Sequence, residues 1–162
     1  KSGEIIPYTE SADKLPAISK YYDYDEGAPG KSAQSNGITC IYRYAEVLLM
    51  YAEASTRATN SVNQDALNAI QEVQKRAGYQ NRQIELTTTT EPAAFLTAVS
   101  NERGWEFFAE MKRWFELVRL EKVKEVRAEE WDASTFNTNH HYYFPVPYQQ
   151  VDLAGWTNNA GY

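Results

Sequence analysis

Three glutamates spaced four residues apart come nearest to a catalytic arrangement in this sequence. Glu102, Glu106 and Glu110 would lie on one face of a helix, and glycoside hydrolysis uses two carboxylates about 5–10 Å apart. The same stretch carries three basic residues, Arg103, Lys112 and Arg113. A helix surface with its own salt bridges is therefore the simpler interpretation. Because nothing else completes an acid–base site, we expect no enzymatic activity, and a glycosidase using Glu102 and Glu106 stays as an alternative.

A second group of charged residues lies beside the apolar face of a predicted helix. Arg43 and Glu46 are three residues apart, and Glu53 follows seven residues after Glu46. Charged side chains that are buried must be paired, because desolvating an isolated charge is costly. We therefore predict a structural ion-pair network that joins two helices and comprises Arg43, Glu46, Glu53, Glu102 and Arg103. A catalytic role is the alternative, since perturbed carboxylates gather at active sites.

The sequence offers no recognisable metal or cofactor site. His140 and His141 are its two histidines, and adjacent side chains on an extended segment point to opposite faces. Cys40 is the single cysteine, which excludes an intrachain disulfide and a multi-thiolate metal site. Glycine-rich phosphate loops and Gly-x-Ser-x-Gly elbows are absent as well. We expect no metal, no cofactor and a solvated loop around the histidines.

Aromatic residues make up 14% of the chain, and twelve of them are tyrosines. A ring in a loop can offer its apolar face to a sugar and its polar edge to a hydroxyl group. The predicted ligand-binding candidates are Trp131, Tyr142, Tyr143 and Trp156. The competing interpretation is that these rings pack against the protein's own helices. Five other aromatics lie in a helical stretch and are expected in the core: Trp105, Phe107, Phe108, Trp114 and Phe115.

Two consecutive helices are predicted in the middle of the chain. The first covers Ile41 to Ala58, and its apolar residues recur at three- and four-residue steps: Tyr44, Val47, Leu48, Tyr51 and Ala52. The second covers Asn63 to Ala77, and Gly78 follows where a left-handed helix cap is favoured. Together the pair has the length of one tetratricopeptide unit of about 34 residues.

A third helical region is predicted from Glu91 to Glu129, with Thr90 as its cap. Its length exceeds that of an ordinary globular helix, so we predict a break near Glu110 to Lys112 and two antiparallel helices. Phe144 to Pro147 must be extended, because each proline restricts its own backbone and that of the preceding residue.

These elements predict a mainly α fold of tetratricopeptide-like helical hairpins with long irregular loops. We expect one domain over residues 1–162, irregular over 1–40, helical over 41–130, and extended or coil over 131–162. Short strands are considered at Glu4–Ile6 and Ile18–Tyr22. One hairpin cannot bury both of its faces, so the chain resembles the end of a larger solenoid.

Charge and hydropathy exclude two classes of partner. The chain has sixteen basic and twenty-two acidic residues, a net charge of −6 and no basic stripe, which argues against nucleic-acid binding. Its longest apolar stretch, Val47 to Ala52, is far shorter than the ~20 residues that cross a bilayer. The polar start at Lys1 does not resemble a secretory signal. A soluble cytoplasmic protein and a piece of a larger one both remain open.

Four stretches then carry recognisable motifs, in order: Tyr42–Ala54; Val73–Gly78; Glu102–Glu110 with Arg113–Arg119; and Phe144–Pro147 with Asn158–Tyr162. The third is similar to E-R-x-x-E-L-x-x-E-G-x-R-W-x-D-L-x-R, and the fourth to P-I-P…Q-N-P-G-Y. Together they resemble the carboxy-terminal part of the SusD/RagB family, the outer-membrane nutrient-binding lipoproteins of Bacteroidetes. Met111 stands where that family usually has glycine, and Asn158 and Ala160 stand in place of its glutamine and proline.

The resemblance implies non-enzymatic glycan or peptide binding on the outer face of the outer membrane. It also implies delivery of the ligand to a SusC-like TonB-dependent transporter, and a lipid anchor that is absent from this chain, since Cys40 is not expected to carry it. Family members use their helices mainly as a scaffold, so Arg43, Glu46, Glu102 and Arg103 are carried over as structural positions. Capture of oligosaccharide or polysaccharide is the leading hypothesis. A helical protein-interaction module with no ligand site of its own is the alternative.

Overall fold

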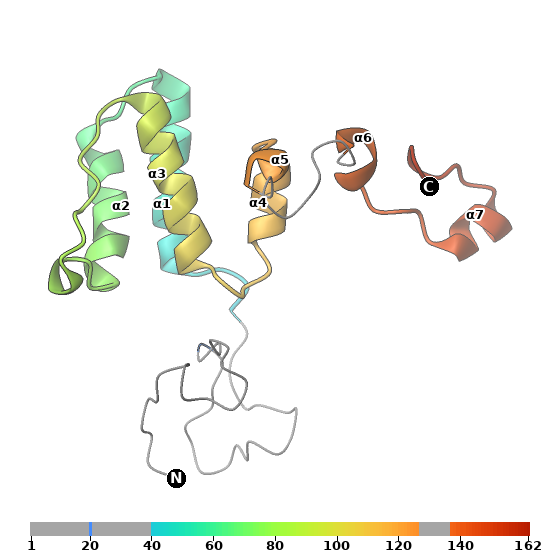
Figure 1. Cartoon of the computed structure of the whole chain (residues 1–162), viewed down its shortest axis with the longest axis horizontal. Helices are drawn as coiled ribbons and strands as arrows, with labels where there is room; N and C mark the ends of the chain where they lie inside the picture. Colours follow the sequence, from blue (N-terminus) through green and yellow to red (C-terminus); the bar gives the residue numbers. More distant parts are fainter. Residues whose placement is uncertain (1–19, 21–39, 127–136) are drawn as a thin grey trace, which may run out of the picture. The chain divides into compact units, whose positions relative to one another are not determined.

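The computed structural model describes residue 20 and residues 40–126 and 137–162, and every structural statement below refers to these. The chain divides into two compact units, Lys1–Glu110 and Met111–Tyr162, each of which is described by itself. In the described residues the regular elements are helices, with no strand, so the predicted mainly α class is confirmed (Figure 1). The short strand considered at Glu4–Ile6 lies outside the described residues.

The described part of the first unit, residue 20 and residues 40–110, contains three α-helices and one short 3₁₀ helix. These are α1 (Tyr44–Thr59), α2 (Gln64–Arg76), η2 (Gln80–Arg82) and α3 (Pro92–Glu106). Helix α1 packs against both α2 and α3, and the three helices lie side by side (Figure 1). The hairpin predicted from the apolar spacing is therefore present, although α1 begins three residues later than predicted.

Local sequence explains the turn between α1 and α2. Asn60, just after α1, has a φ of 48°, in the left-handed region that asparagine tolerates better than most residues. Asn63 then caps α2, because its side-chain oxygen accepts a hydrogen bond of 2.8 Å from the backbone N–H of Ala66. A four-residue connection of this kind makes neighbouring helices antiparallel.

The connection from α2 to α3 is fixed by hydrogen bonds from α2 side chains. Gln74 donates to the Thr87 hydroxyl at 2.9 Å and accepts from the Thr87 N–H at 2.9 Å. Gln71 donates to the Thr87 carbonyl at 2.8 Å. Helix α3 is capped by Glu91 and not by Thr90 as predicted, because the Glu91 carboxylate accepts from the N–H groups of Ala93 and Ala94.

The hydrophobic core of this unit comes from one side of each helix. Its fully buried side chains include Leu49, Ile70, Phe95 and Val99. The apolar face predicted on the first helix is only partly buried, because Tyr44, Val47 and Tyr51 are exposed. The side of α1 that carries Leu49 and Ala52 packs against α2 and α3. Tyr44, Val47 and Tyr51 therefore form an exposed stripe on α1.

The described part of the second unit contains short helices and a small apolar cluster. The helices are α4 (Arg113–Arg119), α5 (Val123–Val126), α6 (Thr138–His141) and α7 (Tyr148–Ala154). Leu117 and Val123 are buried, with Trp114, Val118 and Tyr142 packed against them. The long helical region is thus interrupted where predicted, since α3 ends at Glu106 and α4 begins at Arg113. A second interruption at Leu120–Lys122 was not predicted.

The final residues fold back onto the extended segment that contains the two prolines. Asn158 accepts a hydrogen bond of 2.8 Å from the Val146 N–H, and Asn159 donates to the Phe144 carbonyl at 2.6 Å. The Tyr162 ring stacks on His140, with ring centroids 4.2 Å apart. Gly161 contacts the same imidazole and has a φ of 96°, so a side chain would not fit there. The asparagines of this motif therefore hold the tail in place.

A strained backbone marks the position where the family motif usually carries glycine. Met111 has a φ of 57°, and Ala109 two residues earlier has a φ of 64°. The Met111 side chain is 84% exposed, so packing does not compensate for this conformation. A residue with a Cβ adopts it at a cost of roughly 1–2 kcal/mol.

Replacing Met111 by glycine should raise the free energy of unfolding by about 1 kcal/mol, because glycine adopts a positive φ freely but loses more entropy on folding. Met111→Ala is the matched control, since it removes the exposed side chain and keeps the Cβ. Urea unfolding followed by circular dichroism gives both values. A Met111→Gly protein no more stable than Met111→Ala would show that the strain is absent.

Candidate functional site

Arg43, which precedes the first turn of α1, contacts two carboxylates and an aromatic ring. Its Nη1 atom lies 2.6 Å from a carboxylate oxygen of Glu106, and its Nη2 atom donates to the Glu106 carbonyl at 3.0 Å. Its Nη2 and Nε atoms bond the two Glu110 oxygens at 2.8 and 3.2 Å, a bidentate arrangement. The guanidinium also lies over the Phe107 ring, 4.9 Å from its centroid.

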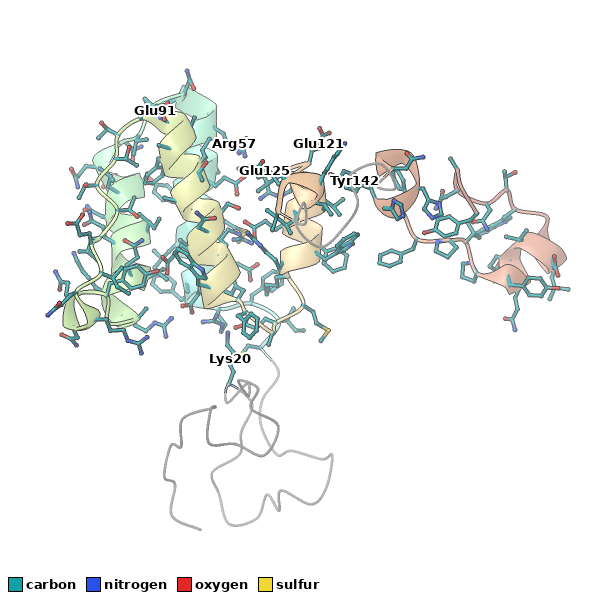
Figure 2. The ribbon with its side chains drawn as sticks, viewed as in Figure 1. Lys20, Arg57, Glu91, Glu121, Glu125 and Tyr142 are labelled. Atoms are coloured by element: carbon teal, nitrogen blue, oxygen red, sulfur yellow. The ribbon has the colours of Figure 1, made fainter. Side chains whose placement is uncertain are left out.

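Two further cations complete the pairing of these carboxylates. Arg76 at the end of α2 bonds the second oxygen of Glu106, and Lys20, labelled in Figure 2, bonds Glu110. Lys20 also donates to the Glu106 carbonyl at 2.7 Å. The Glu106 and Glu110 side chains are only 7% and 6% exposed. The expected salt-bridged surface within one stretch is therefore wrong: the partners come from distant parts of the chain.

These contacts change the acidity of both partners. Burial alone would raise the pKa of Glu110, but hydrogen bonds from Arg43 and Lys20 outweigh it and hold that pKa below its ordinary value. Burial would lower the pKa of Arg43, and the hydrogen bonds to Glu110 and Glu106 raise it instead. A carboxylate held ionised in this way cannot act as a general acid near neutral pH.

Glu102 has a different environment from the one predicted. It is 1% exposed and accepts hydrogen bonds from Gln74 at 3.1 Å and from the Tyr79 hydroxyl at 2.7 Å. Both donors are neutral, so among the described residues Glu102 is not paired with an arginine. Burial and the bond to Glu102 raise the pKa of Tyr79, which keeps its hydroxyl a donor.

The other predicted members of the ion-pair network lie on α1 and α3. Arg103 and Glu46 are both buried, and their charged atoms are 3.6 Å apart between the two helices. Glu53 pairs with Arg57, labelled in Figure 2, at 2.8 Å within α1. The roles of Glu106 and Glu110 as buried partners of Arg43 were missed. Their four-residue spacing was the available signal, but it does not show which distant cation meets them.

The predicted binding aromatics lie in the second unit or outside the described residues. Tyr143 and Trp156 are each 58% exposed, while Tyr142 packs against the Leu117–Val123 cluster. Trp131 lies outside the described residues. The expectation that the helical aromatics are core is wrong in part. Phe107 is buried and Trp114 is partly buried, whereas the others are exposed: Trp105, Phe108 and Phe115.

No metal or membrane-spanning feature is found in the part of the chain that the structure describes. No cluster of three or more His, Cys, Asp or Glu side chains there could hold a metal ion. His140 contacts Tyr162 and His141, as part of the packing of the tail. None of the described helices combines the length and hydropathy needed to cross a bilayer.

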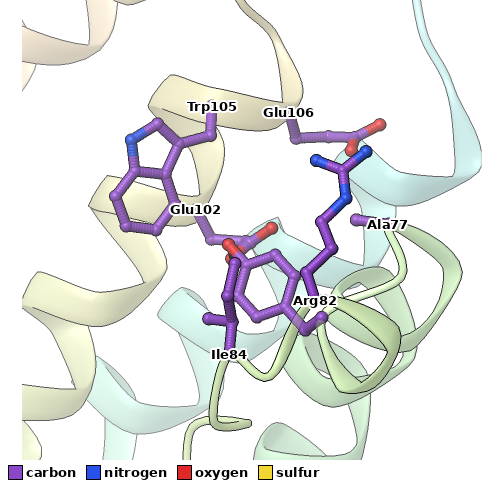
Figure 3. A pocket seen from close by; sticks show the side chains of 7 residues that line it. Ala77, Arg82, Ile84, Glu102, Trp105 and Glu106 are labelled. Carbon is purple, nitrogen blue, oxygen red and sulfur yellow. Dashed lines mark hydrogen bonds between the residues drawn. The ribbon is translucent and has the colours of Figure 1, made fainter.

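A hollow of about 350 Å³ lies beside the ends of α2 and α3 (Figure 3). It is lined by Ala77, Tyr79, Arg82, Ile84, Glu102, Trp105 and Glu106. Figure 3 shows Trp105 and Ile84 on one side and the Arg82 guanidinium pointing toward Glu106 on the other. Its size is at the lower end of the range for small-molecule sites. Sequence reasoning had assigned Trp105 to the core and did not single out Tyr79, Arg82 or Ile84.

Comparison with known proteins then decides the family. A model of the SusD family matches residues 2–162. The chain belongs to the SusD family. Two curated relatives of this SusD-family chain come from Formosa agariphila: SusD-like protein P2 is 29% identical over the whole chain, and SusD-like protein P25 is 27% identical over 86% of it. The chain spans 34% of the length of the first relative and 26% of the second.

Solved structures agree with this assignment. A SusD superfamily protein from Parabacteroides distasonis matches 75% of the chain with a TM-score of 0.63 and 29% identity. A SusD homolog from Bacteroides thetaiotaomicron matches 82% with a TM-score of 0.64 and 26% identity. This chain spans 27% and 30% of those two proteins. The tetratricopeptide-like helical fold is thus shared with SusD superfamily structures.

The Glu110 contacts predict a specific pH dependence of stability. A carboxyl group whose pKa is lower in the folded than in the unfolded state stabilises the fold at pH values above its ordinary pKa. That contribution is lost as the pH falls through the folded pKa. We expect the free energy of unfolding to decline below about pH 4.5. Glu110→Gln cannot ionise and should lower stability at neutral pH while weakening the decline in acid.

Urea unfolding at several pH values measures this dependence. Glu85→Gln is the control, because Glu85 is exposed and forms no ion pair with the described residues. It should retain the wild-type decline. If Glu110→Gln lost stability in acid as steeply as the wild type, the acid dependence would have another source.

Proposed function

We propose that this chain is part of a non-enzymatic protein that binds oligosaccharide or polysaccharide at the outer face of the outer membrane. The protein delivers its ligand to a SusC-like TonB-dependent transporter. The observation that carries this proposal is the match of the SusD family over residues 2–162. The two superfamily structures with the same helical arrangement support it.

The contacts within the first unit support binding without catalysis. The Glu106 and Glu110 carboxylates form ion pairs with cations. Glu102 is buried and accepts hydrogen bonds from Gln74 and Tyr79. A glycosidase needs one carboxyl to exchange a proton with the leaving group and the other to act on the sugar or on water. The glycosidase alternative with Glu102 and Glu106 is therefore disfavoured.

The predicted ligand contacts are the exposed rings of the second unit. Tyr143 and Trp156 present apolar area to solvent, which suits stacking against a pyranose. Tyr142 is the weakest of the candidates, because it already packs against an apolar cluster. Trp131 stays a candidate on its sequence position alone.

A helical protein-interaction module is the second candidate function. The observation that favours it is the exposed stripe of Tyr44, Val47 and Tyr51 on α1, a contiguous apolar surface of the kind found at protein interfaces. Such a module would bind a protein partner and give no response to glycans.

Isothermal titration calorimetry against a panel of neutral and acidic polysaccharides tests the proposed function. We expect at least one to bind without release of reducing sugar. Trp156→Ala should weaken that binding by roughly tenfold or more, since a stacked ring contributes more than about 1 kcal/mol. Tyr148→Ala, which removes an exposed aromatic ring that is not a candidate, is the matched control.

The two alternatives give different results. If no glycan gives a binding heat and a transporter co-purifies with the chain, the protein is an interaction module and the proposal is wrong. Release of reducing sugar that is abolished by Glu102→Gln would replace it by the glycosidase.

A further inference from the structure

The hollow beside α2 and α3 combines an apolar wall with polar groups. Trp105 is 65% exposed although it lies on a helix whose other side is core, and Ile84, which lines the same hollow, is also exposed. The Tyr79 hydroxyl is oriented by its 2.7 Å bond to Glu102. An exposed indole beside a fixed phenol is suited to a sugar ring, which has apolar faces and polar edges.

The charged residues that line the hollow are one cation, Arg82, and two carboxylates, Glu102 and Glu106. Glu106 is bonded by Arg43 and Arg76, and Glu110 by Arg43 and Lys20. Arg82 forms no side-chain hydrogen bond or ion pair with any described residue, yet it lines the hollow and points toward a carboxylate that already has two cations. The Arg82 guanidinium in the hollow is therefore available to an anionic ligand.

We propose that this hollow binds an acidic pyranose, with the sugar ring against Trp105 and its carboxylate or sulfate ester on Arg82. A planar guanidinium binds either anion through two parallel hydrogen bonds. The buried Glu102 faces the same hollow and disfavours an anion there, which directs the acidic group to Arg82. This inference rests on the proposed glycan binding and adds the class of sugar and a second place of contact.

Three sugars that differ only at carbon 6 test the proposal: galactose, galacturonate and galactose 6-sulfate. The indole N–H signals in a ¹⁵N–¹H correlation spectrum report on the four tryptophans, and Trp105→Phe identifies the signal of Trp105. We expect galacturonate or galactose 6-sulfate to shift that signal saturably, with a dissociation constant roughly tenfold or more below that of galactose. Comparison of the two acidic sugars distinguishes a carboxylate from a sulfate ligand.

Arg82→Gln should remove the preference for the acidic sugars and leave the weak response to galactose. Lys75→Gln is the matched control, since it deletes one positive charge from an exposed α2 position that does not line the hollow. Arg82 and Trp105 are exposed, so their variants should fold, and the rest of the spectrum verifies this. An unshifted Trp105 signal with both acidic sugars, or an unchanged preference in Arg82→Gln, would overturn the proposal.

The outcomes separate this inference from the proposed function. If wild type and Arg82→Gln bind the same acidic polysaccharide equally well, glycan capture stands and the assignment of the hollow fails. If galacturonate shifts Trp105 but no polysaccharide binds the chain, the hollow is an acidic-sugar site and the proposed capture function fails.

Discussion

The contact between the Arg43 guanidinium and the carboxylates of Glu106 and Glu110 is the constraint on which the first unit depends. It joins the residue before α1 to the end of α3 and to the turn that follows. The Phe107 ring contacts both Arg43 and Arg103, with guanidinium carbons 4.9 and 5.3 Å from its centroid. Removing Arg43 would take one of two cations from each of two nearly buried carboxylates, and the loss of a partner from a buried charge costs more than the net value of the pair.

This constraint also decides which residues are free to act on a ligand. Glu106 and Glu110 accept several charge-assisted hydrogen bonds, which favours a structural role for these two carboxylates. In our proposal, recognition uses exposed rings, namely Tyr143 and Trp156 in one unit and Trp105 in the other. Arg82 would supply a charged contact in the hollow that Trp105 also lines.

Local signals predicted much of the fold. The recurrence of apolar residues at three- and four-residue steps and the glycine after the second helix act within a few residues, so the hairpin could be predicted. The length of the third helical region predicted the break before α4. The exposure of Trp105 could not, because α3 buries the side that carries Phe95, Val99 and Glu102, and periodicity does not show which side faces a neighbour. The strain at Met111 was signalled by the motif, which usually has glycine there.

The cations that pair with Glu106 and Glu110 could not be predicted from the sequence, for a related reason. Charge spacing along one helix predicts pairs within that helix, whereas Glu106 and Glu110 meet cations that lie 30 to 90 residues away. Which cation arrives depends on how α1 and α2 pack against α3. The hollow depends on the same packing, since its lining residues come both from the segment after α2 and from the end of α3.

A double-mutant cycle between Arg43 and Glu106 tests the central claim most directly. The free energies of unfolding of Arg43→Met, Glu106→Gln, the double variant and the wild type give the coupling between the two side chains. A nearly buried, charge-assisted pair predicts a coupling of about 1–3 kcal/mol. Additive effects, with a coupling below about 0.3 kcal/mol, would contradict the claim that this contact organises the unit.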